Sequence, residues 1–95
     1  MAEVRITWSP LSLQNLTEIT EYISKDSPLN APVFVQKIIQ SVERLVEFPL
    51  SGRKVPEFNN ENIREIIFHN YRIVYRIKAK LIEIVLVTHG AKPLP

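Results

Sequence analysis

Three arginines, Arg64, Arg72 and Arg76, interrupt apolar runs in the C-terminal half of the chain. The runs cover residues 63–77 and 81–87, and their composition is typical of β-strands. Side chains in a strand alternate between the two faces of a sheet, so an arginine inside such a run points away from the core. A guanidinium group offers a planar fork of N–H donors that fits carboxylate or phosphate oxygens. We therefore expect these arginines to form a basic target-binding face.

The charged residues are unevenly distributed along the chain. Residues 1–52 carry four basic and six acidic side chains, whereas residues 53–95 carry eight basic and four acidic ones. The overall formal charge at pH 7 is only +2. A positive C-terminal half favours a nucleic acid or an acidic protein as partner. A basic surface that is merely solvated is the alternative.

Length and composition restrict the other function classes. With 95 residues, 45% of them hydrophobic and 23% charged, we expect residues 1–95 to form one globular domain. Cysteine is absent, which excludes disulfides and thiolate metal sites. Two histidines and two glycines provide neither a metal-ligand cluster nor a glycine-rich phosphate loop, so we expect no metal and no cofactor. The sequence has no apolar run near the roughly 18 residues of a membrane helix and no signal-peptide character, which predicts a cytoplasmic protein without membrane contact.

The N-terminal half has the pattern of one strand followed by two helices. Alternation from Val4 to Trp8 predicts the strand, and Ser9-Pro10 supplies a hydroxyl cap and a first-turn proline for a helix. The second helix should begin around residues 29–31 and end at Pro49. The apolar stripes of the two helices are Leu13, Leu16, Ile19 and Ile23, and Phe34 or Val35, Ile38, Val42 and Leu45. The break between them is short, so they should form an antiparallel hairpin.

The C-terminal half should supply the sheet that this hairpin covers. Residues 50–62 are expected to form a loop with one short strand around Lys54-Val55. His69-Asn70 suits a two-residue hairpin turn because asparagine tolerates a positive φ, and residues 78–80 suit a second turn. The predicted fold class is α+β, with an N-terminal strand and an antiparallel helical hairpin packed on one face of a small antiparallel sheet.

The turns set a register that assigns each strand residue to one face. Pairing Phe68 with Tyr71, and Lys78 with Leu81, predicts a helix-facing set of Ile66, Phe68, Tyr71, Ile73, Tyr75, Ile77, Ile82, Ile84 and Leu86. The opposite face should carry Glu65, Ile67, Arg72, Val74, Arg76, Glu83, Val85, Val87 and His89. Arg76 then lies opposite Glu83, whereas Arg72 lies opposite Val87 and diagonal to His89, with no acid directly across. Arg64 falls on the helix-facing side and should extend along the sheet edge or pair with a helix acid.

Several short motifs occur together in a characteristic order. They are Trp8-Ser9-Pro10, Glu47-Phe48-Pro49, Gly52-Arg53-Lys54-Val55-Pro56-Glu57, Ile63-Arg64-Glu65-Ile66, Tyr71-Arg72-Ile73-Val74-Tyr75-Arg76-Ile77 and Val87-Thr88-His89-Gly90. With the helical hairpin, these motifs resemble the RelE/ParE toxin superfamily, and the proline-then-glycine connection looks more like the ParE branch. The resemblance implies the toxin of a type II toxin–antitoxin system. Its partner would be a separate antitoxin protein, bound in a hetero-oligomer.

The resemblance also implies two alternative activities, inhibition of DNA gyrase and ribosome-dependent mRNA cleavage. Glu57, Arg72 and His89 match catalytic positions of YoeB-like nucleases. Cleavage by a 2′-OH needs a general base, a cation for the phosphorane and an acid, so Glu57 or His89 would be base or acid while Arg72 holds the phosphate. The tyrosine that follows the histidine in those nucleases is Gly90 here, and the lysine cluster with a C-terminal tyrosine of RelE-type enzymes is also absent.

Each candidate residue also has a structural interpretation. Glu57 can cap a turn or pair with Arg53 or Lys54, and His89 can be a solvated strand end. Three functions remain open: a ParE-like gyrase inhibitor, a ribosome-dependent mRNA endonuclease, and a non-toxic binding module. We favour the first because of the hairpin and the missing tyrosine. For either toxin, we expect an antitoxin segment to fold along this protein as an added helix or strand that covers part of the basic face.

Overall fold

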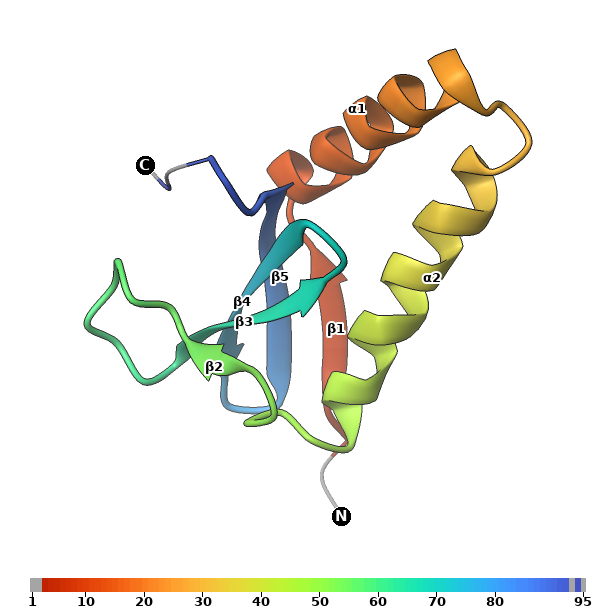
Figure 1. Cartoon of the computed structure of the whole chain (residues 1–95). Helices are drawn as coiled ribbons and strands as arrows, with labels where there is room; N and C mark the ends of the chain where they lie inside the picture. The colour runs from red at the N-terminus through yellow and green to blue at the C-terminus, as the bar shows by residue number, and fades with distance from the viewer. Residues whose placement is uncertain (1–2, 93, 95) are drawn as a thin grey trace.

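The computed structural model describes residues 3–92 and 94 as two helices on one side of a five-stranded sheet (Figure 1). The elements are β1 (Arg5–Trp8), α1 (Pro10–Asp26), α2 (Ala31–Glu43), the 3-10 turn η1 (Arg44–Val46), β2 (Arg53–Lys54), β3 (Ile63–Phe68), β4 (Tyr71–Lys78) and β5 (Leu81–His89). The strand order is β1-β5-β4-β3-β2, with β1 parallel to β5 and the other neighbours antiparallel. The predicted α+β architecture is confirmed. None of the helices among these residues has the length and apolarity needed to cross a bilayer.

Helix α1 begins where the sequence predicted and is fixed to the sheet by its first turns. The Ser9 hydroxyl accepts a hydrogen bond from the Ser12 N–H at 3.0 Å and donates one to the Val85 carbonyl at 2.7 Å. Pairing between β1 and β5 stops at Trp8 opposite Ile84, so this edge of β5 continues without a strand neighbour. The α1 side chains take over there, because the Asn15 side-chain oxygen accepts from the Val87 N–H at 3.0 Å.

The main core lies between the two helices and the sheet. Its buried members are Leu16, Ile19, Ile38, Val42, Leu45, Ile73, Tyr75, Ile82, Ile84 and Val87. Burial of each large aliphatic side chain contributes roughly 1.5–3 kcal/mol, which makes this layer the main source of stability. The helical stripes predicted from the sequence supply half of it. Helix α2 ends at Glu43, earlier than predicted, and η1 carries the last buried residue of its stripe, Leu45.

The predicted register is correct for β3, β4 and the first half of β5. Phe68 pairs with Tyr71, and Ile66 pairs with Ile73. Arg76 pairs with Glu83, as predicted. The positive φ of the first turn, 53°, lies at His69 and not at Asn70, where we expected it. The predicted assignment of residues to the two faces is therefore correct throughout β3 and β4.

A β-bulge makes the predicted register of the second half of β5 wrong. Val74 pairs with Leu86 but Tyr75 pairs with Ile84, so Val85 is an extra residue. Beyond the bulge, Leu86 belongs to the face away from the helices and Val87 to the core, which reverses both assignments.

The bulge also changes the neighbours of the candidate site residues. Arg72 pairs with Thr88 and not with Val87, and His89 pairs with Tyr71 on the helix-facing side. The prediction that Arg72 and His89 lie diagonally on one face of the sheet is therefore wrong.

The second face of the sheet is covered by the segment that follows β2. Val55, Val74 and Leu86 form a small buried cluster there, with Phe58 packed against it. Figure 1 shows residues 55–62, which follow β2, as a loop extending from the sheet on the side away from the helices. This loop brings a carboxylate over β4.

Candidate functional site

Arg72 lies on β4, on the sheet face away from the helices, and is only 7% exposed. Its two terminal nitrogens, Nη1 and Nη2, donate to the two carboxylate oxygens of Glu57, each at 2.8 Å. Its Nε donates to Oε1 of Glu65 at 2.6 Å. No acid lies directly across from Arg72, as predicted, because its strand partners are Ile67 and Thr88, but two carboxylates bind it from other positions.

Glu65 connects Arg72 to a second arginine. The Glu65 side chain is fully buried, and its Oε2 accepts from Nε of Arg53 at 2.6 Å. Charges therefore alternate through Arg53, Glu65, Arg72 and Glu57, which we call the Arg72 network. Buried charges are tolerated only when they are paired and hydrogen-bonded, and Glu65 meets this condition at both oxygens.

Local structure explains how the network assembles. Arg72 pairs with Ile67 of β3, so Glu65, two residues earlier, is its diagonal neighbour on the same face. The two-residue strand β2 aligns Arg53 with Glu65. Buried Val55 then anchors the loop, and a turn after it returns the chain and brings Glu57 over Arg72.

The contact between Arg72 and Glu57 shifts the pKa of both groups. The hydrogen bonds from Arg72 lower the pKa of Glu57 from 4.5 to about 2, against a smaller opposing effect of desolvation. The same contact with Glu57, followed by that with Glu65, raises the pKa of Arg72. A carboxylate with such a low pKa is a weak general base at neutral pH.

His89 lies apart from Glu57. Its ring stands 5.7 Å from that of Tyr71 in an edge-on arrangement, and its Nδ1 accepts from the Ala91 N–H at 3.3 Å. Arg72 lines two shallow hollows of about 280 and 330 Å³, with Glu57 in the first and His89 in the second. The structure thus brings Glu57 and Arg72 into contact, whereas His89 lines an adjoining hollow that shares Ile67, Arg72 and Gly90 with the first.

The other two arginines of the expected basic face also donate hydrogen bonds to groups of the protein itself. Arg64 lies on the opposite face from Arg72, where its Nη1 donates to the Gly52 carbonyl at 2.9 Å and its Nε to the Glu61 carbonyl at 3.1 Å. It binds loop carbonyls and not a helix acid. Arg76 donates from Nη2 to Oε1 of Glu83 at 2.8 Å. The structure does not bring the three guanidinium groups together, and their role in target binding stays a prediction.

Sequence analysis missed the structural roles of Glu65 and Tyr75. Glu65 was assigned to the correct face but not to Arg72, although its diagonal cross-strand position is a usable signal. The fully buried Tyr75 donates from its hydroxyl to the Pro49 carbonyl at 2.7 Å and accepts from the Gly52 N–H at 3.0 Å. Among residues 3–92 and 94, no three acidic or histidine side chains are arranged to hold a metal ion.

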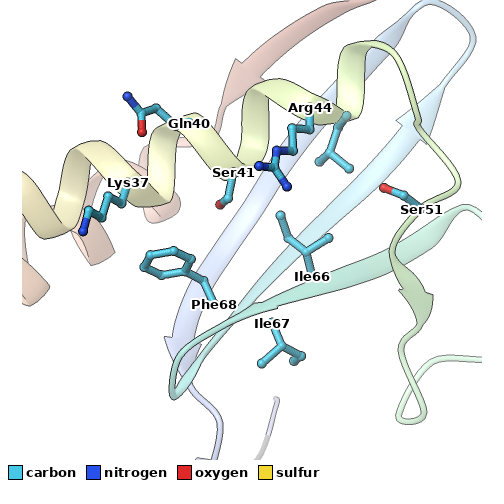
Figure 2. Close-up of a pocket in the computed structure, with 9 residues that line it drawn as sticks. Lys37, Gln40, Ser41, Arg44, Ser51, Ile66, Ile67 and Phe68 are labelled. Atoms are coloured by element: carbon cyan, nitrogen blue, oxygen red, sulfur yellow. The ribbon is translucent and has the colours of Figure 1, made fainter.

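A groove of about 560 Å³ lies between α2–η1 and β3, on the helix side of the sheet (Figure 2). Its apolar lining includes Leu45, Ile66 and Phe68. Lys37 and Arg44 line it on the helix side, and neither forms an ion pair within the described part of the chain. Figure 2 shows Ile67 pointing away from the helix, on the far side of β3. The groove is therefore apolar with a positive rim.

Comparisons with known proteins show the family to which the chain belongs. Residues 6–94 match the family described as the ParE toxin of the type II toxin–antitoxin system parDE. The chain is 36% identical to the protein Y4kP of Sinorhizobium fredii, with 100% of this chain and 97% of that protein covered. It is 32% identical to the toxin RelE2 of Caulobacter vibrioides, with 97% and 99% covered.

Solved structures show the same fold at lower identity. A chain of the chromosomal ParDE toxin–antitoxin system from P. aeruginosa superposes with a TM-score of 0.80 at 20% identity, covering 94% of this chain and 98% of that one. A chain of the toxin–antitoxin complex RelBE2 from Mycobacterium tuberculosis gives 0.66 at 15% identity, with 92% and 98% covered. The protein therefore belongs to the ParE toxin family and is a toxin of the type II toxin–antitoxin class within the RelE/ParE superfamily.

Proposed function

We propose that this toxin acts by binding a protein target, and that DNA gyrase, the target implied by the ParE resemblance, is that protein. The main support for the proposal is that Arg72 is already bound by carboxylates of the protein itself. Its guanidinium group is bound by Glu57 and Glu65, and Glu57 has the pKa of a poor base. Gly90 stands where YoeB-like nucleases have a tyrosine. These features favour binding over phosphate chemistry, and a gyrase inhibitor would act in the cytoplasm.

Inhibition of DNA supercoiling tests this proposal. We expect the purified toxin to inhibit supercoiling by purified gyrase at micromolar concentration, because binding to the enzyme needs no other component. Premixing the toxin with its antitoxin should restore supercoiling. Unchanged supercoiling at these concentrations would contradict the proposal.

An mRNA endonuclease is the second candidate, favoured by the direct contact of Glu57 with Arg72 and by the hollow that Arg72 shares with His89. This function would require Arg72 to release Glu57 and bind a phosphate. In vitro translation followed by mapping of mRNA ends tests it: the second candidate expects new ends in the ribosomal A site, lost in His89→Ala. A chain that yields no such ends is not a ribosome-dependent nuclease. Unchanged colony counts on expression would favour a non-toxic binding module instead.

We also propose that the cognate antitoxin docks an acidic segment with apolar side chains in the groove between α2 and β3. The apolar lining and the cationic rim of Lys37 and Arg44 support this choice. An amphipathic helix or extended segment that orders on binding is a common way to fill such a groove.

Charge reversal at the rim tests the docking site. We expect Lys37→Glu combined with Arg44→Glu to weaken antitoxin binding at least about tenfold at low salt. The reason is that the rim of the groove would become negative and repel the acidic segment of the antitoxin. The matched control is Lys25→Glu combined with Lys78→Glu, which changes the net charge equally at two residues outside the groove. An equal loss in both proteins, or no loss in either, would exclude the groove as the specific site.

A further inference from the structure

The terminal nitrogens of Arg72 form an anion site that the protein fills with its own carboxylate. Arg72 is 7% exposed, yet it lines a hollow on each side. Both contacts to Glu57 are 2.8 Å, which is the parallel two-bond arrangement that an arginine fork makes with a carboxylate. The fork is therefore already arranged to bind an oxyanion through two parallel hydrogen bonds, and in the free protein that oxyanion is a carboxylate.

The two carboxylates on Arg72 differ in how firmly they are held. The side chain of Glu65 is fully buried and lies within β3, where it also binds Arg53. The side chain of Glu57 is 38% exposed and comes from the loop after β2. Glu57 can therefore leave Arg72 without breaking any strand pairing, whereas Glu65 cannot.

The charge around the site fits a monoanion. Without Glu57, the two arginines and Glu65 leave one net positive charge. The Glu65 carboxylate, 2.6 Å from Nε of Arg72, disfavours a second negative charge close by. The single charge of an aspartate or glutamate side chain matches this site, whereas a phosphate dianion does not.

The site is continuous with the groove on the other side of the sheet edge. Ile67 is 53% exposed and lines both the groove and the hollow beside Arg72. Pairing of β2 with β3 ends at Arg53 opposite Glu65, so β2 does not cover β3 at Ile67. A protein segment seated in the groove can cross this edge and reach Arg72.

We propose that Arg72 is a carboxylate-binding site for a protein partner, filled in cis by Glu57 in the free protein. An aspartate or glutamate side chain of the antitoxin replaces Glu57 when the complex forms. The inference rests on the proposed function for the identity of the partner, but not for the existence of the site. The turn that carries Glu57, between Val55 and β3, is then free to move away from the sheet.

The site itself is tested on the free protein with acetate as the probe. In 200 mM sodium acetate at pH 7.5, we expect the melting temperature of Glu57→Ala to rise by about 4 °C relative to sodium chloride of equal ionic strength, because acetate binds only the folded state. Wild type and Glu61→Ala, which removes an exposed glutamate of the same loop, should not respond. Equal shifts in all three proteins, or a larger shift in phosphate than in acetate, would overturn the proposal.

Exchange by the partner is tested with the purified antitoxin. Because Glu57 competes with the antitoxin carboxylate, Glu57→Ala and Glu57→Gln should each bind the antitoxin about tenfold more tightly than wild type, while Glu61→Ala binds as wild type does. Unchanged or weaker binding of both Glu57 variants would show that the antitoxin does not bind at Arg72. A chain that binds no antitoxin in any form would contradict the proposed function, and the acetate result would still decide whether the site exists.

Discussion

Replacement of Glu65 by glutamine is expected to lower the free energy of unfolding by about 3–5 kcal/mol, the usual cost of breaking a buried ion pair. Both Glu65 oxygens accept from arginines at 2.6 Å, so the amide NH₂ of glutamine would face an N–H donor at one of them. Arg72 would keep its charge in a nearly buried position with only Glu57 as partner. For a chain of this size, the melting temperature should fall by at least about 12 °C.

An exposed glutamate of the preceding loop provides the matched control. Glu61 pairs with Lys54 at 3.1 Å, and the two side chains are 81% and 58% exposed. Glu61→Gln should therefore change the free energy of unfolding by less than about 1 kcal/mol. Chemical denaturation of both variants measures the difference, and equal values would show that the Glu65 ion pairs contribute no more than surface pairs do.

A double replacement separates lost pairing from lost packing. Glu65→Leu with Arg72→Met removes both buried charges, and the carboxylate and guanidinium groups left behind, on Glu57 and Arg53, are accessible to water. We expect the double variant to be more stable than Glu65→Gln, because apolar replacement of a buried pair is often neutral. A double variant less stable than the single one would argue against an electrostatic origin of the effect.

Replacement of Gly52 by alanine is expected to cost about 2–4 kcal/mol by overpacking and loss of a hydrogen bond. The added Cβ would lie 2.6 Å from the Tyr75 hydroxyl and 2.7 Å from the Glu65 carbonyl oxygen. Neither neighbour moves easily, because Tyr75 is fully buried and the carbonyl belongs to β3. Relief of the overlap would separate the Gly52 N–H from the Tyr75 hydroxyl and loosen the start of β2.

The second glycine of the chain is the control. At Gly90, the nearest atom to an added Cβ is the Asn70 carbonyl oxygen at 3.2 Å, which needs a shift of only a few tenths of an ångström. Gly90→Ala should cost less than about 1 kcal/mol in thermal denaturation. Tyr75→Phe combined with Gly52→Ala should cost less than the sum of the single variants, since the closest contact is gone. A Gly52→Ala protein as stable as Gly90→Ala would contradict the packing described here.

Sequence patterns predicted most of the fold because, in most strands and helices, they showed which residues face the core. The turn at His69-Asn70 fixed the pairing of Phe68 with Tyr71, and parity then placed all of β4 correctly. Residues 84–87 are all apolar, so no alternation of apolar and polar residues shows which of them face the helices. The sequence therefore could not reveal that Val85 is an extra residue. The neighbouring edge of β5 is bound by Ser9 and Asn15 of α1, far away in the sequence. The bulge is thus a tertiary feature.

The candidate site was only partly accessible from sequence for a related reason. The position of Arg72 away from the helices followed from parity, but its partners did not. The Glu57 contact depends on the path of an irregular loop after Val55, which no periodicity describes. The Glu65 contact is a diagonal pair that the register already contained. Charge pattern alone suggested an open basic face, whereas Arg64, Arg72 and Arg76 each donate to carbonyl or carboxylate oxygens of the protein itself.

In the free protein Glu57 occupies the fork of Arg72, and NMR titration of the Glu57 side-chain carboxyl carbon tests this contact. A folded-state pKa below 4.5 means that this pair contributes stability above that pH, and that the contribution is lost as the pH falls towards 2. We expect a titration midpoint of about 2 in wild type. A midpoint at or above 4.5 would contradict the account, because it would mean that Arg72 is free to bind another anion.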